Sequence, residues 1–274
     1  MSAAPFFIVS SGRSGTAMLH KALSAIAGVE MHHEYMVQIT QPLAVRRYLG
    51  LVDAQQTARL IGETYGGAIR YSGAAHWGDS SNKLSWLIPD LAAAFPEARF
   101  VHLVRDGRKV ASSYFHKLGD ECNDDVSTDI LRAHVEDGLP APPPEKKYWW
   151  PLPRQGSADA ARFRAFSQFE RICWHWAELN RVVLEELSRL SAERTLFVKL
   201  EELRASPSEV QKLYEFLGLP YRDAAYEAYT RPHNVNRPED RLLDAGQRQQ
   251  FEAIAGEMQA RLGYAGTPEY VVNY

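Results

Sequence analysis

A short loop near the start of the chain has the composition of an anion-binding site. It reads S-S-G-R-S-G-T over residues 10–16, after an apolar run and before apolar residues at helical spacing. A turn from strand to helix leaves backbone N–H groups aimed at one point, and glycines let an anion approach them closely. The spacing therefore predicts a phosphate or sulfate cradle, formed by Gly12, Arg13, Ser14, Gly15, Thr16 and Ala17.

A second candidate anion site follows the apolar run at residues 99–104. The segment V-R-D-G-R-K-V-A-S-S places Arg105 at the end of a predicted strand and Ser113 eight residues later, two turns into a predicted helix. A guanidinium can bind an anion through two hydrogen bonds, and a serine adds a donor. Two anion sites separated by a strand edge match a nucleotide with phosphates at its 3' and 5' positions.

The first loop differs from that of an ATP-dependent kinase. A kinase loop needs a lysine late in the pattern G-x-x-x-x-G-K-[ST] and an acidic magnesium ligand after a strand. Here the basic residue, Arg13, comes early, and no lysine stands between Gly15 and Thr16. A P-loop nucleotide kinase is nevertheless one alternative, and a catalytically inert nucleotide-binding module is another.

Several blocks together resemble the PAPS-dependent sulfotransferase superfamily, where PAPS is 3'-phosphoadenosine 5'-phosphosulfate. They are Arg13-Ser14-Gly15-Thr16, the spacing from Arg105 to Ser113, Asn82-Lys83, L-V-R-D-G-R, V-K-L-E-E-L and E-F-L-G-L-P. The combination looks most like the tyrosylprotein-sulfotransferase and related bacterial branch. The resemblance is weak over residues 119–165, and Leu200 stands where the family often has an aromatic residue.

The resemblance implies a donor, a product and a role for each basic residue. The donor would be PAPS, the product adenosine 3',5'-bisphosphate, and no metal would be required. Residues 12–16 would hold the 5'-phosphate, while Arg105 and Ser113 would hold the 3'-phosphate. Arg13 and Lys83 would stabilise the sulfuryl and bridging oxygens. Arg237, in a polar loop, would contact the nucleotide.

The reaction also needs a base that takes the proton of the acceptor hydroxyl. Glu34 follows a short predicted strand at residues 29–31, which places it at the carboxyl edge of the sheet, where α/β proteins bind ligands. Its position matches the catalytic glutamate of the resembling family. His33 and His32 are rivals, because histidine titrates near neutral pH and other sulfotransferase branches use it. The acceptor class remains open.

Alternating strand and helix patterns predict an α/β fold with a P-loop-like parallel sheet flanked by helices. We expect one domain over residues 1–274, with a Pro-rich insertion at about 119–165 on the substrate side. Its aromatic residues, Tyr148, Trp149 and Trp150, either form a stacking face for the acceptor or anchor the insertion to the core. Three helix starts carry capping-box patterns: Asp53 with Gln56, Ser206 with Glu209, and Asp244 with Gln247.

Composition narrows the class of protein. The chain has 274 residues, 45% hydrophobic and 24% charged, with a formal net charge of −3, so nucleic acid is not an expected partner. No apolar run approaches the roughly 20 residues of a membrane span, and the start lacks signal-peptide features. We therefore expect a cytoplasmic protein with Cys122 and Cys173 reduced. No pattern indicates a metal site or an oligomeric state.

Overall fold

A parallel sheet of five strands forms the centre of the molecule. The computed structural model describes residues 2–230 and 242–269. The strands are β1 (Ala4–Ser10), β2 (Val29–His33), β3 (His76–Ser81), β4 (Arg99–Val104) and β5 (Thr195–Lys199). They are arranged in the order β2-β3-β1-β4-β5, and every pairing is parallel. The predicted α/β class is confirmed.

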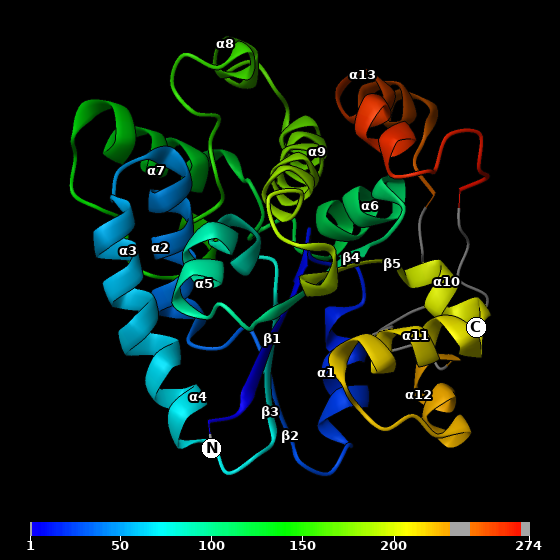
Figure 1. Cartoon of the computed structure of the whole chain (residues 1–274). Helices are drawn as coiled ribbons and strands as arrows, with labels where there is room; N and C mark the ends of the chain where they lie inside the picture. Colours follow the sequence, from blue (N-terminus) through cyan, green and yellow to red (C-terminus); the bar gives the residue numbers. More distant parts are fainter. Residues whose placement is uncertain (1, 231–241, 270–274) are drawn as a thin grey trace.

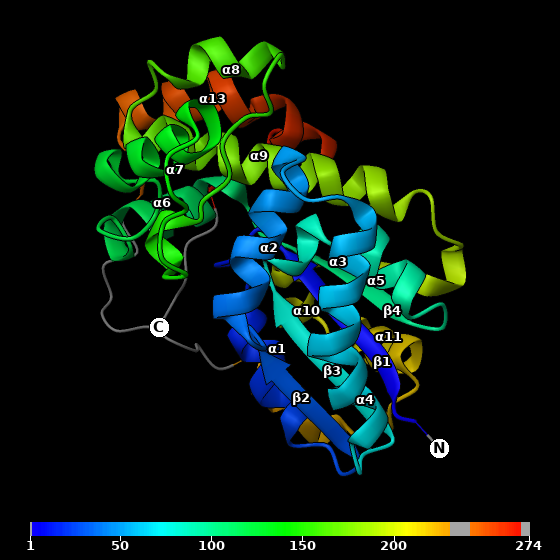
Figure 2. The ribbon, with the colours of Figure 1, turned by 90° about the vertical axis from the view of Figure 1, so that its left-hand side faces the viewer.

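Helices cover both faces of this sheet and one of its ends (Figure 1; Figure 2). The helices α2, α3, α4 and α5 lie on one face, and α1 and α11 lie on the other. The helices α6, α7, α8, α9 and α13 gather near the end where β1 finishes. The α-helices are α1 (Thr16–Ser24), α2 (Val37–Leu49), α3 (Ala54–Ile61), α4 (Gly67–Tyr71), α5 (Ile88–Ala94), α6 (Gly107–Lys117), α7 (Asp125–Asp137), α8 (Ala158–Phe163), α9 (Gln168–Leu187), α10 (Leu200–Ala205), α11 (Pro207–Leu217), α12 (Glu227–Thr230) and α13 (Ala245–Arg261). Shorter turns are the π-helix η1 (Gly62–Gly66) and the 3-10 helices η2 (Leu84–Trp86), η3 (Lys146–Tyr148), η4 (Ala192–Arg194) and η5 (Asp223–Tyr226).

The central strand β1 is buried on both sides, which explains its unbroken apolar sequence. Phe6 and Ile8 pack into the cluster that includes α1 and α11. Phe7 and Val9 point the other way, into the cluster built from α2, α5 and α9. This two-sided packing fixes the position at which β1 ends and the first loop begins.

The strand β3 is absent from the sequence prediction, because H-W-G-D-S-S has no apolar run. It nevertheless lies between β2 and β1 and pairs with both. Its Gly78 is required by packing, since a Cβ there would come within 2.2 Å of the Phe6 ring and 2.7 Å of the Met31 sulfur. The following residues, Asp79 and Ser80, are fully buried polar side chains. The helix α2 is also absent from that prediction.

A long helical segment begins at the predicted Asp53–Gln56 capping box, which is formed. It continues to Tyr71, because α3, η1 and α4 follow one another without a break. Three glycines, Gly62, Gly66 and Gly67, adopt helical φ angles of −59°, −61° and −66° in this segment. A Cβ added at any of them would meet no atom within 4 Å.

The other two predicted caps have different outcomes. Asp244 and Gln247 form a capping box at the start of α13. The box predicted at Ser206 and Glu209 is wrong, since no side-chain cap is formed at α11. These exposed side chains bond elsewhere: the Ser206 hydroxyl lies 2.8 Å from that of Ser208, and Glu209 accepts from Lys212 at 2.6 Å.

The insertion is more regular than its composition suggested, because it contains α7 and α8.

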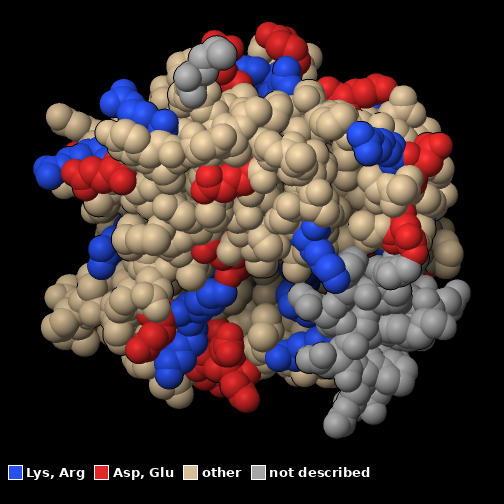
Figure 3. All heavy atoms as spheres, turned by 90° about the horizontal axis from the view of Figure 1, so that it is seen from below, with Lys and Arg blue, Asp and Glu red and all other residues tan. Residues whose placement is uncertain are grey.

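Cys122 and Cys173 are both buried and free. On the face shown in Figure 3, basic and acidic side chains are interspersed and no large patch of one sign forms. Within residues 2–230 and 242–269, no helix is both long and apolar enough to cross a bilayer.

Candidate active site

The first loop connects β1 to α1 with an unusual backbone. Gly12, Arg13 and Gly15 have φ angles of +78°, +54° and +97°, all in the left-handed region. For Arg13 this conformation costs on the order of 1 kcal/mol, so the surrounding packing must enforce it. The first helical hydrogen bond joins the Leu19 amide to the Gly15 carbonyl. The amides of Thr16 and Ala17 therefore have no partner within the helix and can face an anion.

Neighbouring side chains pack closely around this loop. A Cβ at Gly12 would come within 1.9 Å of the Tyr114 hydroxyl oxygen, and one at Gly15 would come within 2.7 Å of Leu200. Tyr114 donates a hydrogen bond of 2.9 Å to the Ser11 carbonyl. Leu200, the departure from the expected aromatic residue, thus packs directly beneath the loop. Both loop glycines are required by this close approach as well as by their φ angles.

The Ser14 hydroxyl lies inside the loop. It is buried, donates to the Gly12 carbonyl at 3.0 Å and lies 3.0 Å from the Ser11 hydroxyl. Ser14 therefore shapes the loop with its side chain, and its part in the anion cradle stays a prediction.

Arginines from two different loops meet beside the ends of β1 and β4. The Arg13 Nε donates to the Ser113 hydroxyl at 2.9 Å, and the Arg105 Nη1 donates to the Arg13 carbonyl at 3.1 Å. The Arg105 Nε is buried with no protein partner. Among the described residues, no carboxylate lies within ion-pair distance of Arg13 or Arg105. Arg13 thus contacts both residues of the second predicted anion site, Ser113 through its side chain and Arg105 through its carbonyl.

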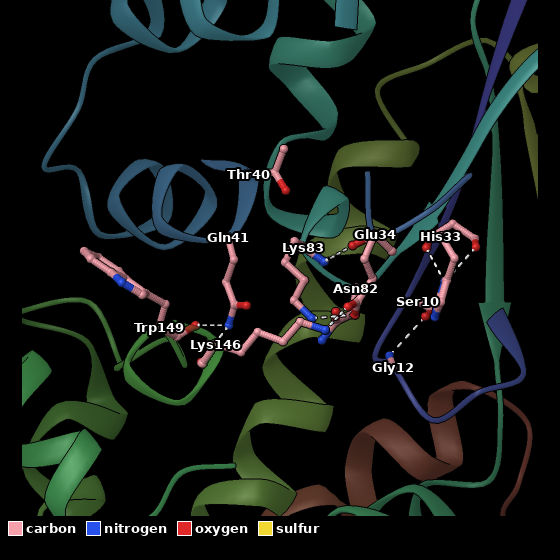
Figure 4. A network of polar contacts seen from close by, with 12 residues as sticks. Ser10, Gly12, His33, Glu34, Thr40, Gln41, Asn82, Lys83, Lys146 and Trp149 are labelled. Atoms are coloured by element: carbon pink, nitrogen blue, oxygen red, sulfur yellow. Dashed lines mark hydrogen bonds and ion pairs between the residues drawn. The ribbon is translucent and has the colours of Figure 1, made fainter. Parts of the chain in front are cut away.

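Glu34 occupies the turn that follows β2. Its φ is +58°, and its amide donates to the Ser80 carbonyl at 3.1 Å. Lys83, just beyond β3, donates to Glu34 Oε1 at 2.7 Å (Figure 4). The ammonium of Lys146 contacts the second oxygen, Oε2. One carboxylate thus pairs with two lysines that lie 63 residues apart in the sequence.

The two lysines decide the charge state of Glu34. Burial alone would raise the pKa of this carboxyl group, but Lys83 and Lys146 outweigh burial and lower it to about 2. Burial lowers the pKa of Lys83, against the opposing attraction of Glu34. Glu34 is therefore ionised throughout the physiological range.

Aromatic side chains enclose Lys83 on the side away from solvent. Its ammonium lies 5.8 Å from the Trp150 ring centroid. The His175 ring lies 5.2 Å from that of Trp150, and neither of its nitrogens has a protein partner. Burial and the nearby charge of Lys83 lower the pKa of His175 to about 3, so it is neutral. Lys83 is thus fixed in a low-dielectric setting where its charge acts strongly on neighbours.

The two histidines that precede Glu34 in the chain have other partners. His33 Nδ1 contacts the Ser80 carbonyl at 2.8 Å and the Ser80 hydroxyl at 3.1 Å. His32 Nε2 contacts Glu30 at 2.9 Å, and its ring packs against Trp77 at a centroid distance of 4.9 Å. Of the three candidate bases, Glu34 is the one in contact with Lys83.

Asp79 is a site-adjacent residue that the sequence did not reveal. It accepts from the Tyr35 amide at 3.2 Å and from the Tyr65 hydroxyl at 3.3 Å. Burial raises its pKa to about 6, although both hydrogen bonds oppose that rise. Because Tyr35 follows Glu34, Asp79 holds the turn that carries Glu34. The sequence feature that could have revealed Asp79 is an acidic residue shortly before Asn82-Lys83. It lies in β3, the strand that was not predicted.

Lys146 was missed as well, and it belongs to the insertion. Gln41 of α2 donates to the Lys146 carbonyl at 3.1 Å and to the Trp149 carbonyl at 2.7 Å (Figure 4). Trp149 and Trp150 are buried, and their ring nitrogens donate to the carbonyls of Pro143 and Glu121. Of the two alternatives for these tryptophans, the structure supports anchoring to the core. The signal available in the sequence was the lysine pair before Y-W-W.

A sequence comparison identifies the family. The pattern of the Sulfotransferase family matches residues 5–141, which is half of the chain. The matched segment contains Arg13, Glu34, Lys83, Arg105 and Ser113. The chain belongs to the Sulfotransferase family. No curated protein sequence gives a significant match.

Solved sulfotransferase structures share the fold. A sulfotransferase from Alicyclobacillus acidocaldarius matches with a TM-score of 0.54 and 16% identity, covering 98% of this chain and 98% of that chain. The sulfotransferase domain of the Synechococcus PCC 7002 olefin synthase matches with a TM-score of 0.54 and 15% identity, covering 98% and 96%. The sulfotransferase STF9 from Mycobacterium avium matches with a TM-score of 0.51 and 14% identity, covering 95% of this chain and 77% of that chain. At sequence identities of 14% to 16%, the similarity to these structures shows a shared fold alone.

Family membership implies a donor of the PAPS type, and the described residues fit its charges. The loop supplies amides at the start of α1, and the Arg105 Nε is a buried donor with no protein partner. Within the described part of the chain, no group of three or more His, Cys, Asp or Glu side chains is arranged to hold a metal ion. Arg237, the remaining predicted nucleotide contact, lies outside the described residues.

Proposed function

We propose that this sulfotransferase moves the sulfuryl group of PAPS to an acceptor hydroxyl by in-line displacement. One observation carries the proposal: a cationic, hydroxyl-bearing cluster and a carboxylate–lysine pair flank the same loop at the carboxyl edge of the sheet. Arg13, Arg105 and Ser113 form the first. Glu34 and Lys83 form the second. The transfer needs these two functions, because a donor rich in anionic oxygens must meet a hydroxyl that is losing its proton.

The cationic cluster would bind the donor. Loop amides at residues 12–17 and the Thr16 hydroxyl would hold the 5'-phosphate, while Arg105 and Ser113 would hold the 3'-phosphate. Arg13 lies between these groups, and its guanidinium would face the sulfuryl oxygens. Arg13 and Arg105 are half-buried cations without a carboxylate partner among the described residues, so an anionic ligand would stabilise this part of the molecule when it binds.

Glu34 would take the proton of the acceptor hydroxyl. Its direct contact with Lys83 supports this role, since the same lysine can then act on charge that develops on the departing oxygen. The contacts that His32 and His33 make with Glu30 and Ser80 support Glu34 over either histidine. Bound PAPS supplies the electrophilic sulfur and the bisphosphate leaving group.

Family membership favours this function over the alternatives drawn from sequence. The Sulfotransferase family is a family of enzymes, so neither an ATP-dependent kinase nor an inert nucleotide-binding module fits as well. We also infer a relation to the tyrosylprotein-sulfotransferase and related bacterial branch. It rests on Asn82-Lys83 and on the blocks V-K-L-E-E-L and E-F-L-G-L-P. The acceptor is a hydroxyl compound of open class.

Calorimetry with the donor product tests the proposal. Adenosine 3',5'-bisphosphate should bind without magnesium, and both AMP and ATP should bind much more weakly, because the first lacks the second phosphate and the second has its phosphates in one chain. Equal affinity for AMP and the bisphosphate would refute the assignment. An acceptor screen with labelled donor, read by mass spectrometry for sulfonated products, would then define the acceptor class.

A further inference from the structure

Both oxygens of Glu34 are already occupied in this structure. Lys83 contacts Oε1 and Lys146 contacts Oε2. A general base must come within hydrogen-bond reach of the proton that it removes. On the proposed function, an acceptor hydroxyl therefore competes with these two lysines for the Glu34 carboxylate.

The two lysines differ in how freely they can move. The Lys83 side chain is 6% exposed and its ammonium lies 5.8 Å from the Trp150 ring centroid, whereas the Lys146 side chain is 43% exposed. Lys146 can swing its ammonium into solvent without leaving a cavity, and Lys83 cannot. Lys146 is therefore the partner that an incoming acceptor would displace.

The backbone that carries Lys146 is nevertheless fixed. Gln41 binds the carbonyls of Lys146 and Trp149, and the buried indole of Trp149 donates to the Pro143 carbonyl at 2.8 Å. The contact with Glu34 thus comes from a partly exposed side chain on a segment whose backbone is held. Such an arrangement suits a group that must leave and return in each catalytic cycle.

We propose that Lys146 is a positioning residue that blocks Glu34 until an acceptor displaces it, so that bound donor is not transferred to water. In the unwanted reaction a water oxygen bonds to the donor sulfur and the sulfur–oxygen bond to the 5'-phosphate breaks. The water proton goes to Glu34, and the products are sulfate and adenosine 3',5'-bisphosphate. With Lys146 on Oε2 and Lys83 on Oε1, each oxygen of Glu34 still has a free acceptor site. The two ammonium groups nevertheless stabilise its negative charge, so the carboxylate is a weaker base towards a water molecule.

The charges around Glu34 set the expected pH behaviour. The titratable groups that face it are Lys83, Lys146, Asp79, His33 and Tyr114. Of these, the two lysines lower the pKa of Glu34 and are in direct contact with it. Removal of the Lys146 charge should raise that pKa, because one stabilising cation is lost while burial is retained.

The test compares donor hydrolysis by the Lys146→Met variant and by the wild type in the absence of any acceptor. Hydrolysis is measured as the release of labelled sulfate from sulfur-labelled PAPS. We expect an increase of about tenfold or more over the wild type, and an acid limb of the rate profile displaced to higher pH. Lys147→Met is the matched control, because its ammonium lies 4.8 Å from the Tyr148 ring and it makes no described contact with Glu34. That control should leave hydrolysis unchanged, and Lys146→Arg should keep it low.

Two results would overturn the inference. Hydrolysis by Lys146→Met that equals the wild type at every pH would show that Lys146 does not block the base. Hydrolysis that falls, as in a Glu34→Gln variant, would show that Lys146 acts on the donor itself. Wild-type protein that fails to bind adenosine 3',5'-bisphosphate would instead refute the proposed function. Thermal unfolding of each variant confirms that the fold is intact.

Discussion

The proposed donor side and the proposed acceptor side of the site balance their charges differently. On the donor side, Arg13 and Arg105 have no carboxylate partner among the described residues. On the acceptor side, Glu34 is paired with both Lys83 and Lys146. A cation without a partner is ready for an external anion, whereas a carboxylate paired with two ammonium groups is a weaker base until one of them moves. On the proposed function, the donor site is therefore preorganised and the acceptor site is not.

The largest effect should come from the base. Glu34→Gln keeps the shape of the side chain but cannot accept the proton, so turnover should fall by about two to three orders of magnitude. Affinity for adenosine 3',5'-bisphosphate, measured by calorimetry, should stay close to that of the wild type. A phenol acceptor of low pKa should recover part of the rate.

His33→Ala serves as the control for that assignment. It should retain most of its turnover, because His33 contacts Ser80 and not Lys83. The reverse pattern, with Glu34→Gln active and His33→Ala inactive, would assign the base to the histidine.

The turn that carries Glu34 can be tested through stability. Asp79 has a pKa of about 6 in the folded protein and 3.8 when exposed, so the folded state holds its proton longer as pH rises. This group therefore lowers the free energy of unfolding between pH 4 and 6, by about 3 kcal/mol in total, with the loss complete above pH 6. Asp79→Asn should remove that slope in urea unfolding series at pH 4 to 7. If the free energies of unfolding of the wild type and the variant differ by the same amount at every pH, the assignment to Asp79 is contradicted.

On the donor side, Arg105→Ala should weaken adenosine 3',5'-bisphosphate binding by about 2 kcal/mol or more, since a charge-assisted contact is lost. The loss should be much smaller for AMP, which lacks the 3'-phosphate. Arg70, an exposed residue at the opposite end of the sheet, provides a control, and Arg70→Ala should bind like the wild type. Equal losses for AMP and the bisphosphate would place Arg105 elsewhere in the site.

The smallest effect is expected for Ser113→Ala, which removes one neutral donor while leaving the Arg105 charge. Bisphosphate binding should weaken by about 1 kcal/mol. Because Arg13 donates to the Ser113 hydroxyl, part of that loss should reflect a less restrained Arg13. A double variant with Arg13→Ala should show a combined loss smaller than the sum, and strict additivity would contradict the coupling.

The same contrast explains what could be predicted from sequence. The donor side is built from two βα units in which the key residues are close together, at residues 10–17 and 105–113. Their spacing fixes their geometry. The acceptor side combines Glu34, Lys83 and Lys146, which come from three segments. Two of these were predicted through the position of Glu34 after a strand and the Asn82-Lys83 block.

Lys146 and Asp79 could not be predicted from local patterns. The path of the insertion depends on where Trp149 and Trp150 are buried, and their sequence does not specify that place. Asp79 lies in a strand whose stability comes from its neighbours β1 and β2, since its own residues have little strand propensity. Tertiary context decided both positions.

The glycines of the segment from α3 to α4 have a consequence for local opening of the molecule. Gly62, Gly66 and Gly67 lose more backbone entropy on ordering than alanines would, at about 0.5–1 kcal/mol each, and gain no side-chain packing. The segment should therefore exchange its amide hydrogens sooner than the helices packed around it. Tyr65 lies within this segment and donates to Asp79, which in turn holds the Tyr35 amide. Each opening of the segment thus briefly releases the support behind the Glu34 turn.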